Sequence, residues 1–277
     1  MNKITIAGLK FQMVKAGSVF IGEDRGGWIY SGQRPKHEVR CPDFYIMEAP
    51  MTLPELANIL EAKLAPEDET TWNKERLTAI LAIVNQTLID SNVDLDSSLD
   101  WEIRCPTQGE WLHAKNTKKI EVECGMKEVL ADAVAPNYRG AMMDGRPRQF
   151  DGHGPMQWHT ATMEIHPNKA SIHALSSAPM DRDNIGLSVR LVLTPIRKGD
   201  PKTVPKKADY GANIRSELLW TTVLGVIPSF AIPWLRGLGD YVYSGWVNLL
   251  FGGLCVGFVT GAIWRPRRPI ITYEQGE

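Results

Sequence analysis

The chain has 277 residues, of which 43% are hydrophobic and 23% are charged. This apolar fraction excludes a wholly disordered or low-complexity protein, and the length suffices for one large domain or two small ones. The formal net charge is −1, but the part from Arg197 onward has 10 basic and 6 acidic residues, whereas the part before it has 21 basic and 26 acidic residues. Proteins that bind nucleic acid concentrate positive charge on their folded domain, so nucleic acid is not expected as a partner.

The cysteines and the N-terminal segment both indicate a reduced compartment. Cys41, Cys105, Cys124 and Cys255 form no Cys-x-x-Cys pair, and Cys255 lies within an apolar run. This pattern is typical neither of a disulfide framework nor of a zinc site. The segment Met1–Lys10 is too polar and too short for the core of a signal peptide. We therefore expect the N-terminal part to lie in the cytoplasm.

The first 196 residues predict short strands and helices. Thr52 with Glu55, and Thr107 with Glu110, are capping boxes that mark two helix starts. Apolar residues at helical spacing predict another helix over about 74–88. In chain order, we predict two short strands within 10–21 separated at Ala16-Gly17, a strand over 38–46, a helix after Thr52, the helix over 74–88, a short helix after Thr107, and a strand over 187–194.

The region after Asn137 is dominated by Gly, Pro, Asp and His and shows few periodic patterns. Such a composition is typical of loops, so we predict long irregular loops there. Early helices combined with short strands and long loops indicate an α+β domain over residues 1–196, with much of its surface built from loops.

Two long uncharged runs lie near the C-terminus. Residues 218–235 form an 18-residue run without a charge, and residues 241–264 form one of 24 residues. A membrane-spanning helix needs about 20 apolar residues, so the second run is long enough and the first only just is. Pro228 and Pro233 are expected to kink the first run or to end it early. We predict a two-helix transmembrane hairpin over 217–264, with a pair of buried core helices as the alternative.

The residues that flank the two runs predict their orientation. A basic linker over 197–216 precedes the hairpin and a short tail over 265–277 follows it, whereas the turn between the runs holds Arg236 alone. The positive-inside rule places both ends of the hairpin in the cytoplasm and the protein in the cell (inner) membrane, with the linker against anionic lipid headgroups. The predicted membrane-interface residues are Trp220, Trp234, Tyr241, Trp246, Trp264, Lys206, Lys207, Arg265, Arg267 and Arg268.

The second run carries Gly253, Gly257 and Gly261 at four-residue spacing. A stripe of small residues lets another helix approach closely, so we predict a helix-packing surface. Its partner is either the first run or an integral-membrane protein of a larger complex. Neither run contains Asp, Glu, Lys, Arg or His, and ion conduction is therefore not expected.

Short motifs follow one another in a fixed order across residues 4–196. The central motif is Arg-Cys-Pro-Thr-x-x-Glu-Trp over 104–111. The other residues of the pattern are Phe11, Met13, Val14, Gly17, Phe20, Ile21, Gly22, Arg34, Pro35, His37, Val39, Phe44, Ile46, Pro50, Thr52, Ala135, Asn137, Gly154 to Trp158, Gly186, Val189 and Arg190. This pattern resembles the formylglycine-generating enzyme/sulfatase-modifying-factor family, whose domain is similar to the C-type lectin fold.

The resemblance implies a fold more directly than an activity. Catalytic members of this family use two cysteines late in the domain to bind copper, because Cu(I) prefers sulfur ligands. This chain has no cysteine between Cys124 and Cys255. We therefore expect a protein that is not an enzyme and that carries no cofactor. Trp158 and Arg190 are expected to be core and structural residues rather than ligand-binding ones.

Relatives of this family also bind iron through His-x-x-x-His-x-Glu, a pattern that is absent here. The histidines nearest to such a set are His153, His159, His166 and His173, which are six or seven residues apart. They are weak candidates for metal ligands, and the alternative interpretation is that they are solvated loop positions or hydrogen-bond partners. Family members also hold calcium in loops, and the possible ligands for it here are Asp151, Asp181 and Asp183.

Three classes of function stay open at this point. The preferred hypothesis is a non-catalytic, membrane-anchored accessory or scaffold subunit of a larger integral-membrane complex. The first alternative is a lectin-like module that binds a peptide or small molecule with the loops between 137 and 185. The second alternative is a metal-dependent oxidoreductase of the formylglycine-generating family, which would need a metal bound by the four histidines.

Overall fold

The computed structural model describes residues 3–60, 74–91, 93, 95–150, 152, 155–180, 186–265 and 267–277. The chain divides into two compact units. Unit 1 contains Met1–Ile21, Glu38–Ala135 and Ala141–Thr203, and unit 2 contains Gly22–His37, Pro136–Gly140 and Val204–Glu277. The domain boundary that the sequence places after residue 196 stays a prediction. Two segments from within that range, 22–37 and 136–140, group with the C-terminal part of the chain.

Unit 1 contains an antiparallel sheet of five strands in the order β1-β2-β5-β11-β6. These strands are β1 (Lys3–Ile6), β2 (Leu9–Val14), β5 (Phe44–Met47), β6 (Trp101–Arg104) and β11 (Val192–Pro195). Ala7 and Gly8 connect β1 to β2 with φ values of 50° and 78°. A two-residue hairpin turn of this kind needs a positive φ at both positions, which glycine adopts without strain.

Two helices pack their apolar side chains against this sheet. Helix α1 (Leu53–Ile59) begins at the capping box of Thr52 and Glu55, as predicted. Helix α2 (Lys74–Asp90) confirms the predicted helix over 74–88. One helical face of α2 is buried in the same core as strands β1, β2, β6 and β11, through Leu77, Ile80, Val84 and Leu88.

A second sheet in unit 1 has the order β10-β7-β8-β9. Its strands are β7 (Lys127–Ala133), β8 (His159–His166), β9 (Lys169–Pro179) and β10 (Leu187–Ser188), and the short helix η3 (Pro155–Trp158) precedes β8. Helix α3 (Gln108–Asn116) buries Trp111 against Leu130 and Met163 of this sheet. The unit therefore combines helices and sheets, and the predicted α+β class is confirmed.

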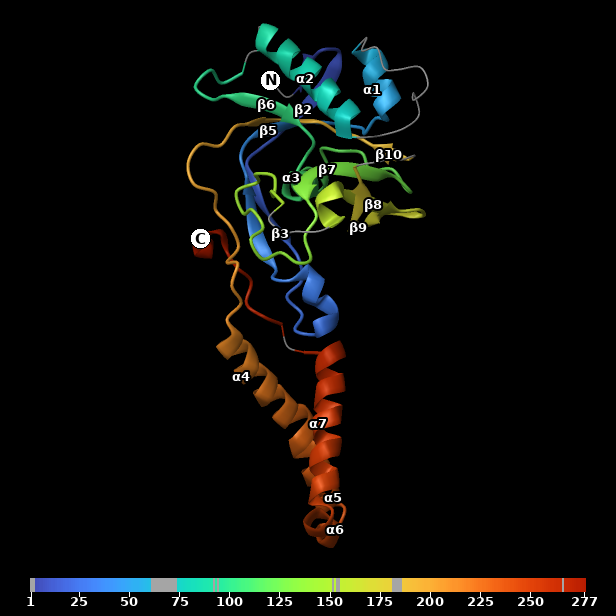
Figure 1. Ribbon diagram of the computed structural model, residues 1–277, viewed down its shortest axis with the longest axis vertical. Coiled ribbons are helices and arrows are strands. Elements are labelled where there is room, and N and C mark those ends of the chain that lie inside the picture. The colour runs from blue at the N-terminus through green and yellow to red at the C-terminus, as the bar shows by residue number, and fades with distance from the viewer. Residues whose placement is uncertain are drawn as a thin grey trace. The chain divides into compact units, whose positions relative to one another are not determined.

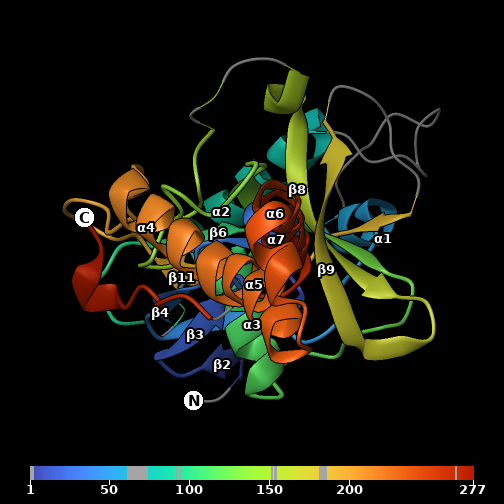
Figure 2. The ribbon, with the colours of Figure 1, turned by 90° about the horizontal axis from the view of Figure 1, so that it is seen from below.

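The prediction of irregular loops throughout 137–185 is wrong for residues 159–179. Strands β8 and β9 form a long antiparallel hairpin there, and they lie side by side in Figure 2. The turn His166-Pro167-Asn168-Lys169 is a sequence signal for such a hairpin. The alanines and serines of β9 obscured it, because these residues have no strong preference for strands.

Two predicted strands are each divided in the structure. The strand predicted over 38–46 is divided into β4 (His37–Cys41) and β5, with Pro42 between them. Proline has no N–H group to donate to a ladder, so it ends β4. The strand predicted over 187–194 is divided into β10 and β11. The two strands predicted within 10–21 are confirmed as β2 and β3 (Gly17–Ile21), and β3 pairs with β4 in a two-stranded sheet.

Unit 2 contains a helical hairpin, which is drawn in orange and red in Figure 1. Its first arm is a continuous helix made of α4 (Tyr210–Thr221), the π-helical turn η4 (Thr222–Val226) and α5 (Ile227–Leu235). The arm has 26 residues and could cross a membrane by length and composition alone. Of the two expected outcomes, a kink or an early end, the early end does not occur, because α5 continues past Pro228 and Pro233 to Leu235. Pro228 lies in the first turn of α5, directly after a π-helical turn that accommodates its missing N–H group.

The second arm consists of α6 (Gly239–Ser244) and α7 (Trp246–Ile263). The sequence predicts one uninterrupted run over 241–264, whereas in the structure α6 ends at Ser244 and α7 begins at Trp246, with Gly245 between them. The apolar part of α7, Trp246–Gly261, is shorter than a full span. The described residues therefore supply one helix of spanning length, and a second span stays a prediction.

Glycines allow the two arms to touch along their backbones. A Cβ atom on Gly253 would lie 2.6 Å from Ser229 Oγ and 2.8 Å from Val226 Cα, and one on Gly257 would lie 2.9 Å from the carbonyl oxygen of Thr221. Real Cβ atoms do not approach other atoms so closely. Of the two partners that the sequence allows, these two glycines therefore contact the chain's own first arm.

Unit 2 also contains the short helices η1 (Trp28–Gln33) and η5 (Tyr273–Gln275). After α7 the chain returns along the segment 22–37. The N–H of Arg268 donates to the carbonyl of Asp24 at 2.6 Å, and the N–H of Ile271 donates to that of Lys36 at 3.0 Å. The segment 136–140 joins them, because the N–H of Tyr138 donates to the carbonyl of Arg34 at 2.9 Å.

Candidate functional site

The central sequence motif lies at the start of α3, and its polar side chains hold that helix in place. Arg104 forms two parallel bonds to the carboxylate of Glu110, with Nη1–Oε2 at 2.8 Å and Nη2–Oε1 at 2.9 Å. Glu110 also accepts the N–H of Thr107, as its capping box requires. All three residues are buried. Their bonds are therefore satisfied within unit 1, and the motif has a structural role.

A second buried ion pair joins the closing strand region to the second sheet. The guanidinium of Arg190 contacts the carboxylate of Glu128, with Nε–Oε2 at 2.8 Å and Nη2–Oε1 at 3.0 Å, and both side chains are fully buried. Arg190 also donates to the carbonyls of Met47 and Glu121, both at 2.7 Å. The indole N–H of Trp111 donates to the same carboxylate at 3.0 Å. The expected structural role of Arg190 is confirmed.

The cysteines of unit 1 do not form a reactive pair. Cys41 and Cys105 are buried, and burial raises the pKa of both thiols, to about 12 for Cys105. Such thiols stay protonated at neutral pH, whereas a metal ligand or nucleophile must be a thiolate. Cys124 is exposed in unit 1, and Cys255 is exposed on α7 of unit 2.

The candidate histidine ligands do not converge where the structure describes them. His159 and His166 begin and end β8, so at about 3.3 Å per residue they are about 23 Å apart. His173 lies in β9 beside Lys115, whose Nζ is 2.6 Å from His173 Nδ1. No group of three potential metal ligands occurs among the described residues. His153, Asp151, Asp181 and Asp183 lie outside them.

Trp158 is not a core residue, contrary to expectation, because its side chain is 55% exposed. It lies at the end of η3, directly before β8. An aromatic residue in an apolar-rich motif suggests burial, but a one-turn helix at a strand end leaves such a side chain on the surface.

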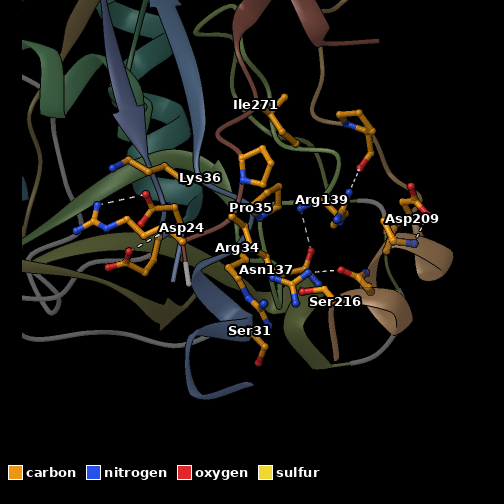
Figure 3. Close-up of a pocket in the computed structure, with 18 of the residues that line it drawn as sticks. Asp24, Ser31, Arg34, Pro35, Lys36, Asn137, Arg139, Asp209, Ser216 and Ile271 are labelled. Atoms are coloured by element: carbon orange, nitrogen blue, oxygen red, sulfur yellow. Dashed lines mark hydrogen bonds and ion pairs between the residues drawn. The ribbon is translucent and has the colours of Figure 1, made fainter. Parts of the chain in front are cut away.

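Unit 2 contains the cavity that forms the candidate site, and Figure 3 shows its lining side chains. Its volume is about 760 Å³. The lining comes from the segment 22–37, the segment 136–140, the segment 205–209, helix α4 and the return segment after α7. The lining residues are Glu23, Asp24, Ser31, Arg34, Pro35, Lys36, Asn137, Arg139, Pro205, Lys207, Ala208, Asp209, Ala212, Asn213, Ser216, Glu217, Trp220, Arg267, Arg268, Pro269 and Ile271.

Most acidic groups of the cavity already have partners. Arg267 Nη1 lies 3.3 Å from Asp24 Oδ2, and Arg268 Nη2 lies 3.6 Å from Glu217 Oε1. Asp209 caps α4, with its Oδ1 accepting the N–H of Ala212 at 2.9 Å. These carboxylates neutralise the cations beside them and fix the start of α4.

Arg34 differs from Arg267 and Arg268, which pair with carboxylates of the cavity. Its Nη1 donates to the carbonyl of Gly26 at 3.1 Å, and its buried Nε has no hydrogen-bond partner in the described part of the chain. Burial lowers the pKa of Arg34, and the neighbouring charges of Arg268 and Arg139 lower it further, whereas Glu217 opposes them. A guanidinium in such surroundings favours the approach of an anion.

The sequence placed some, but not all, of these residues at a site. Lys207, Arg267, Arg268 and Trp220, predicted as membrane-interface residues, line the cavity. Arg34 and Arg139 were missed as site residues, because they are far from the hairpin in sequence. Arg139 Nη1 donates to the carbonyls of Pro205 at 3.2 Å and Lys207 at 3.1 Å. The only sequence signals for these two residues were weak: the Arg34-Pro35 step, and the loop composition of the segment 136–140.

The other predicted interface residues lie elsewhere on unit 2. Trp234 and Tyr243 stack edge to face near the tip of the hairpin, with ring centroids 6.0 Å apart. Trp246 and Trp264, at the two ends of α7, are 53% and 64% exposed, and Tyr241 and Lys206 are also exposed. Their role at a membrane interface stays a prediction.

Arg265 closes the base of the hairpin. Its guanidinium pairs with Glu217 of α4, and its Nε donates to the carbonyl of Gly261 at 3.0 Å. A Cβ atom on Gly261 would collide with this guanidinium. The third glycine of the predicted stripe therefore makes room for the Arg265 side chain, which forms an ion pair between the arms.

Comparisons with known proteins show a similarity of fold to a solved structure. No family model matches the sequence, and no curated protein matches it. The structure is similar to that of PvdO from Pseudomonas aeruginosa, with a TM-score of 0.50 and 11% sequence identity over 70% of this chain and 99% of that chain. Variable protein 1 of Treponema denticola matches with a TM-score of 0.43 and 15% identity, over 70% of this chain and 98% of that chain. At this identity the likeness to PvdO concerns the fold alone.

Proposed function

We propose that the chain is a non-catalytic accessory or scaffold subunit of a larger integral-membrane complex, anchored by the helical hairpin. In this proposal, unit 1 is a divergent formylglycine-generating-enzyme-like, C-type-lectin-like domain on the cytoplasmic side of the cell (inner) membrane. Both arms of the hairpin span the bilayer, and anionic lipid headgroups and integral-membrane subunits are its partners.

The observation that carries the proposal is the outward surface of the hairpin. The two arms pack against each other at Gly225, Gly253 and Gly257. Large apolar side chains point away from this contact and are exposed. Phe251 and Phe258 of α7 are 68% and 67% exposed. Soluble proteins rarely expose apolar patches above about 300–600 Å². A lipid phase, or partner helices within it, would cover such a surface.

The chemistry of unit 1 supports a role without catalysis. The motif residues Arg104, Glu110 and Arg190 are bound to other protein groups in buried pairs. The sequence lacks the late cysteine pair on which the family's copper chemistry depends. A scaffold needs a stable fold and surfaces for partners, and these are the features that unit 1 supplies.

Extraction from native membranes tests the proposal. The protein is solubilised in a mild detergent, separated by size, and the co-migrating proteins are identified by mass spectrometry. Membrane proteins in a fixed ratio to this chain are the expected result. A lone species of 31 kDa would contradict the accessory-subunit proposal.

A matched pair of variants tells whether the partner contacts the hairpin. Phe251 and Phe258 are seven residues apart and lie on one face of α7, away from the glycine contact. Replacing both by alanine is expected to weaken co-migration at least tenfold while the chain stays in the membrane. The control replaces both by leucine, which keeps a large apolar surface there. Equal co-migration of the alanine and wild-type chains would place the partner contact elsewhere.

A further inference from the structure

The cavity of unit 2 has more cationic than anionic lining residues. Six basic side chains face four acidic ones: Arg34, Lys36, Arg139, Lys207, Arg267 and Arg268 against Glu23, Asp24, Asp209 and Glu217. Asp24 pairs with Arg267, Glu217 pairs with Arg268, and Asp209 caps the start of α4, as described above. Glu23 Oε1 accepts the N–H groups of Asp24 at 2.9 Å and Arg25 at 3.2 Å. The carboxylates of the chain therefore leave a cationic excess in the cavity.

Arg34 is the centre of this excess. Its guanidinium has one hydrogen bond, to a backbone carbonyl, and no carboxylate of the described chain pairs with it. Its Nε is buried and has no hydrogen-bond partner among the residues that the structure describes. A guanidinium presents a planar fork of donors that fits the oxygens of a phosphate group. Arg139, which donates to the backbone carbonyls of Pro205 and Lys207, adds a second positive charge to the same cavity.

The apolar part of the lining indicates what else the ligand carries. Trp220 lines the cavity and belongs to the apolar run of the first arm. Pro35, Pro269 and Ile271 add further apolar surface. At about 760 Å³ the cavity is larger than one inorganic phosphate needs, and ligand pockets of this size hold molecules with polar and apolar parts. A phospholipid headgroup with its glycerol has this combination.

We propose that this cavity binds a phosphate group through Arg34, and that an anionic phospholipid supplies it. The lipid as source rests on the membrane anchoring proposed above, because the base of the hairpin then lies at headgroup level. The phosphate chemistry itself depends only on the residues of the cavity.

Native mass spectrometry of the full chain tests the proposal. The protein is purified in detergent, stripped of lipid, and mixed with phosphatidylglycerol or, in parallel, with zwitterionic phosphatidylcholine. We expect one retained phosphatidylglycerol per chain and at least tenfold weaker retention of phosphatidylcholine. Arg34→Gln is expected to weaken phosphatidylglycerol retention at least tenfold, and Arg34→Lys less, because it keeps the charge but loses the fork. Arg236→Gln, which removes the same charge at the far end of the hairpin, is the control and is expected to change nothing.

Each other outcome has a defined meaning. Equal losses in the Arg34 and Arg236 variants would reduce the effect to general surface charge and overturn the site. If millimolar inorganic phosphate displaces the bound lipid and the two lipids are retained equally, the phosphate site is supported. The same result would overturn an anionic phospholipid as the source of the phosphate. A chain that stays in solution without detergent would contradict the anchoring, and phosphate binding that Arg34→Gln abolishes would still support the cavity. Gel filtration of the Arg34 variants verifies that they are folded.

Discussion

The arginines of unit 1 and those of the cavity in unit 2 differ in the groups that they bind. In unit 1, Arg104 and Arg190 each form two parallel bonds to a buried carboxylate. In the cavity, Arg34 donates to a backbone carbonyl instead, and its buried Nε has no hydrogen-bond partner among the described residues. Arginine therefore has a structural role in the buried ion pairs of unit 1, whereas in our proposal Arg34 of unit 2 binds a ligand. What separates the two roles is the presence of a matching carboxylate.

The largest expected effect comes from removing such a carboxylate in unit 1. Glu128→Gln would leave the fully buried Arg190 charge without its counterion. Breaking a buried ion pair on one side typically costs about 3–5 kcal/mol, because the remaining charge has lost its hydration as well as its partner. We expect the free energy of unfolding in detergent to fall by about that amount.

The control for this prediction is an exposed ion pair of the same unit. Lys3 and Glu48 lie 3.2 Å apart with side chains 66% and 50% exposed. Glu48→Gln is expected to cost less than about 1 kcal/mol, since water solvates the remaining lysine. Equal effects of the two substitutions would contradict a structural role for the Glu128 pair.

The next effect concerns the contact between the arms of unit 2. Gly253→Ala would place a methyl group against Ser229 and Val226 of the first arm, so the arms must separate. We expect a loss of about 1–3 kcal/mol from overpacking, measured as a lower thermal unfolding midpoint in detergent. The adjacent Gly252 has open space around it, and Gly252→Ala should leave the midpoint unchanged or slightly higher. A fall of the same size for both variants would show that the effect does not depend on the contact between the arms.

The helical elements were predicted better than the cavity, for a physical reason. Helix α2 follows from the spacing of Leu77, Ile80, Val84 and Leu88 within a few turns, and a capping box needs only four residues. The cavity joins Arg34 to residues more than 170 positions later in the chain, such as Arg268. Such a meeting depends on tertiary contacts, which a local pattern does not contain.

In the hairpin, too, the sequence predicted less than the structure shows, although the residues involved are closer together in the chain. Its two apolar runs and its glycine stripe were visible in the sequence, but the role of each glycine was not. Gly253 and Gly257 contact the first arm, whereas Gly261 makes room for the Arg265 side chain four residues later. The spacing of small residues predicts a close approach, and only the packed structure shows what approaches.

A smaller difference in stability is expected between two capping boxes, one buried and one exposed. Thr107 and Glu110 cap α3 inside the core, and Thr52 and Glu55 cap α1 at the surface. Loss of an N-cap hydroxyl costs about 1 kcal/mol, and more where water cannot replace it. Thr107→Ala should therefore lower the free energy of unfolding more than Thr52→Ala. Chemical denaturation of the two variants measures the difference, and a larger loss at Thr52 would contradict the role of burial.

The smallest expected effect is a pH dependence in unit 1. Burial lowers the pKa of His173 below its ordinary value, and the charge of Lys115 lowers it further. The lysine Nζ lies 2.6 Å from His173 Nδ1, so it donates to the neutral ring and would repel a protonated one. Between the lowered pKa and about 6.5, the unfolded chain binds more protons than the folded one, so stability falls as the pH falls through this range. The stabilising contribution is complete above about pH 7. We expect the unfolding midpoint of the wild type to drop more between pH 7.5 and 5.5 than that of His173→Gln. In Lys115→Met the drop should also be smaller, because the repelling charge is gone, and identical slopes in all three proteins would refute the interaction.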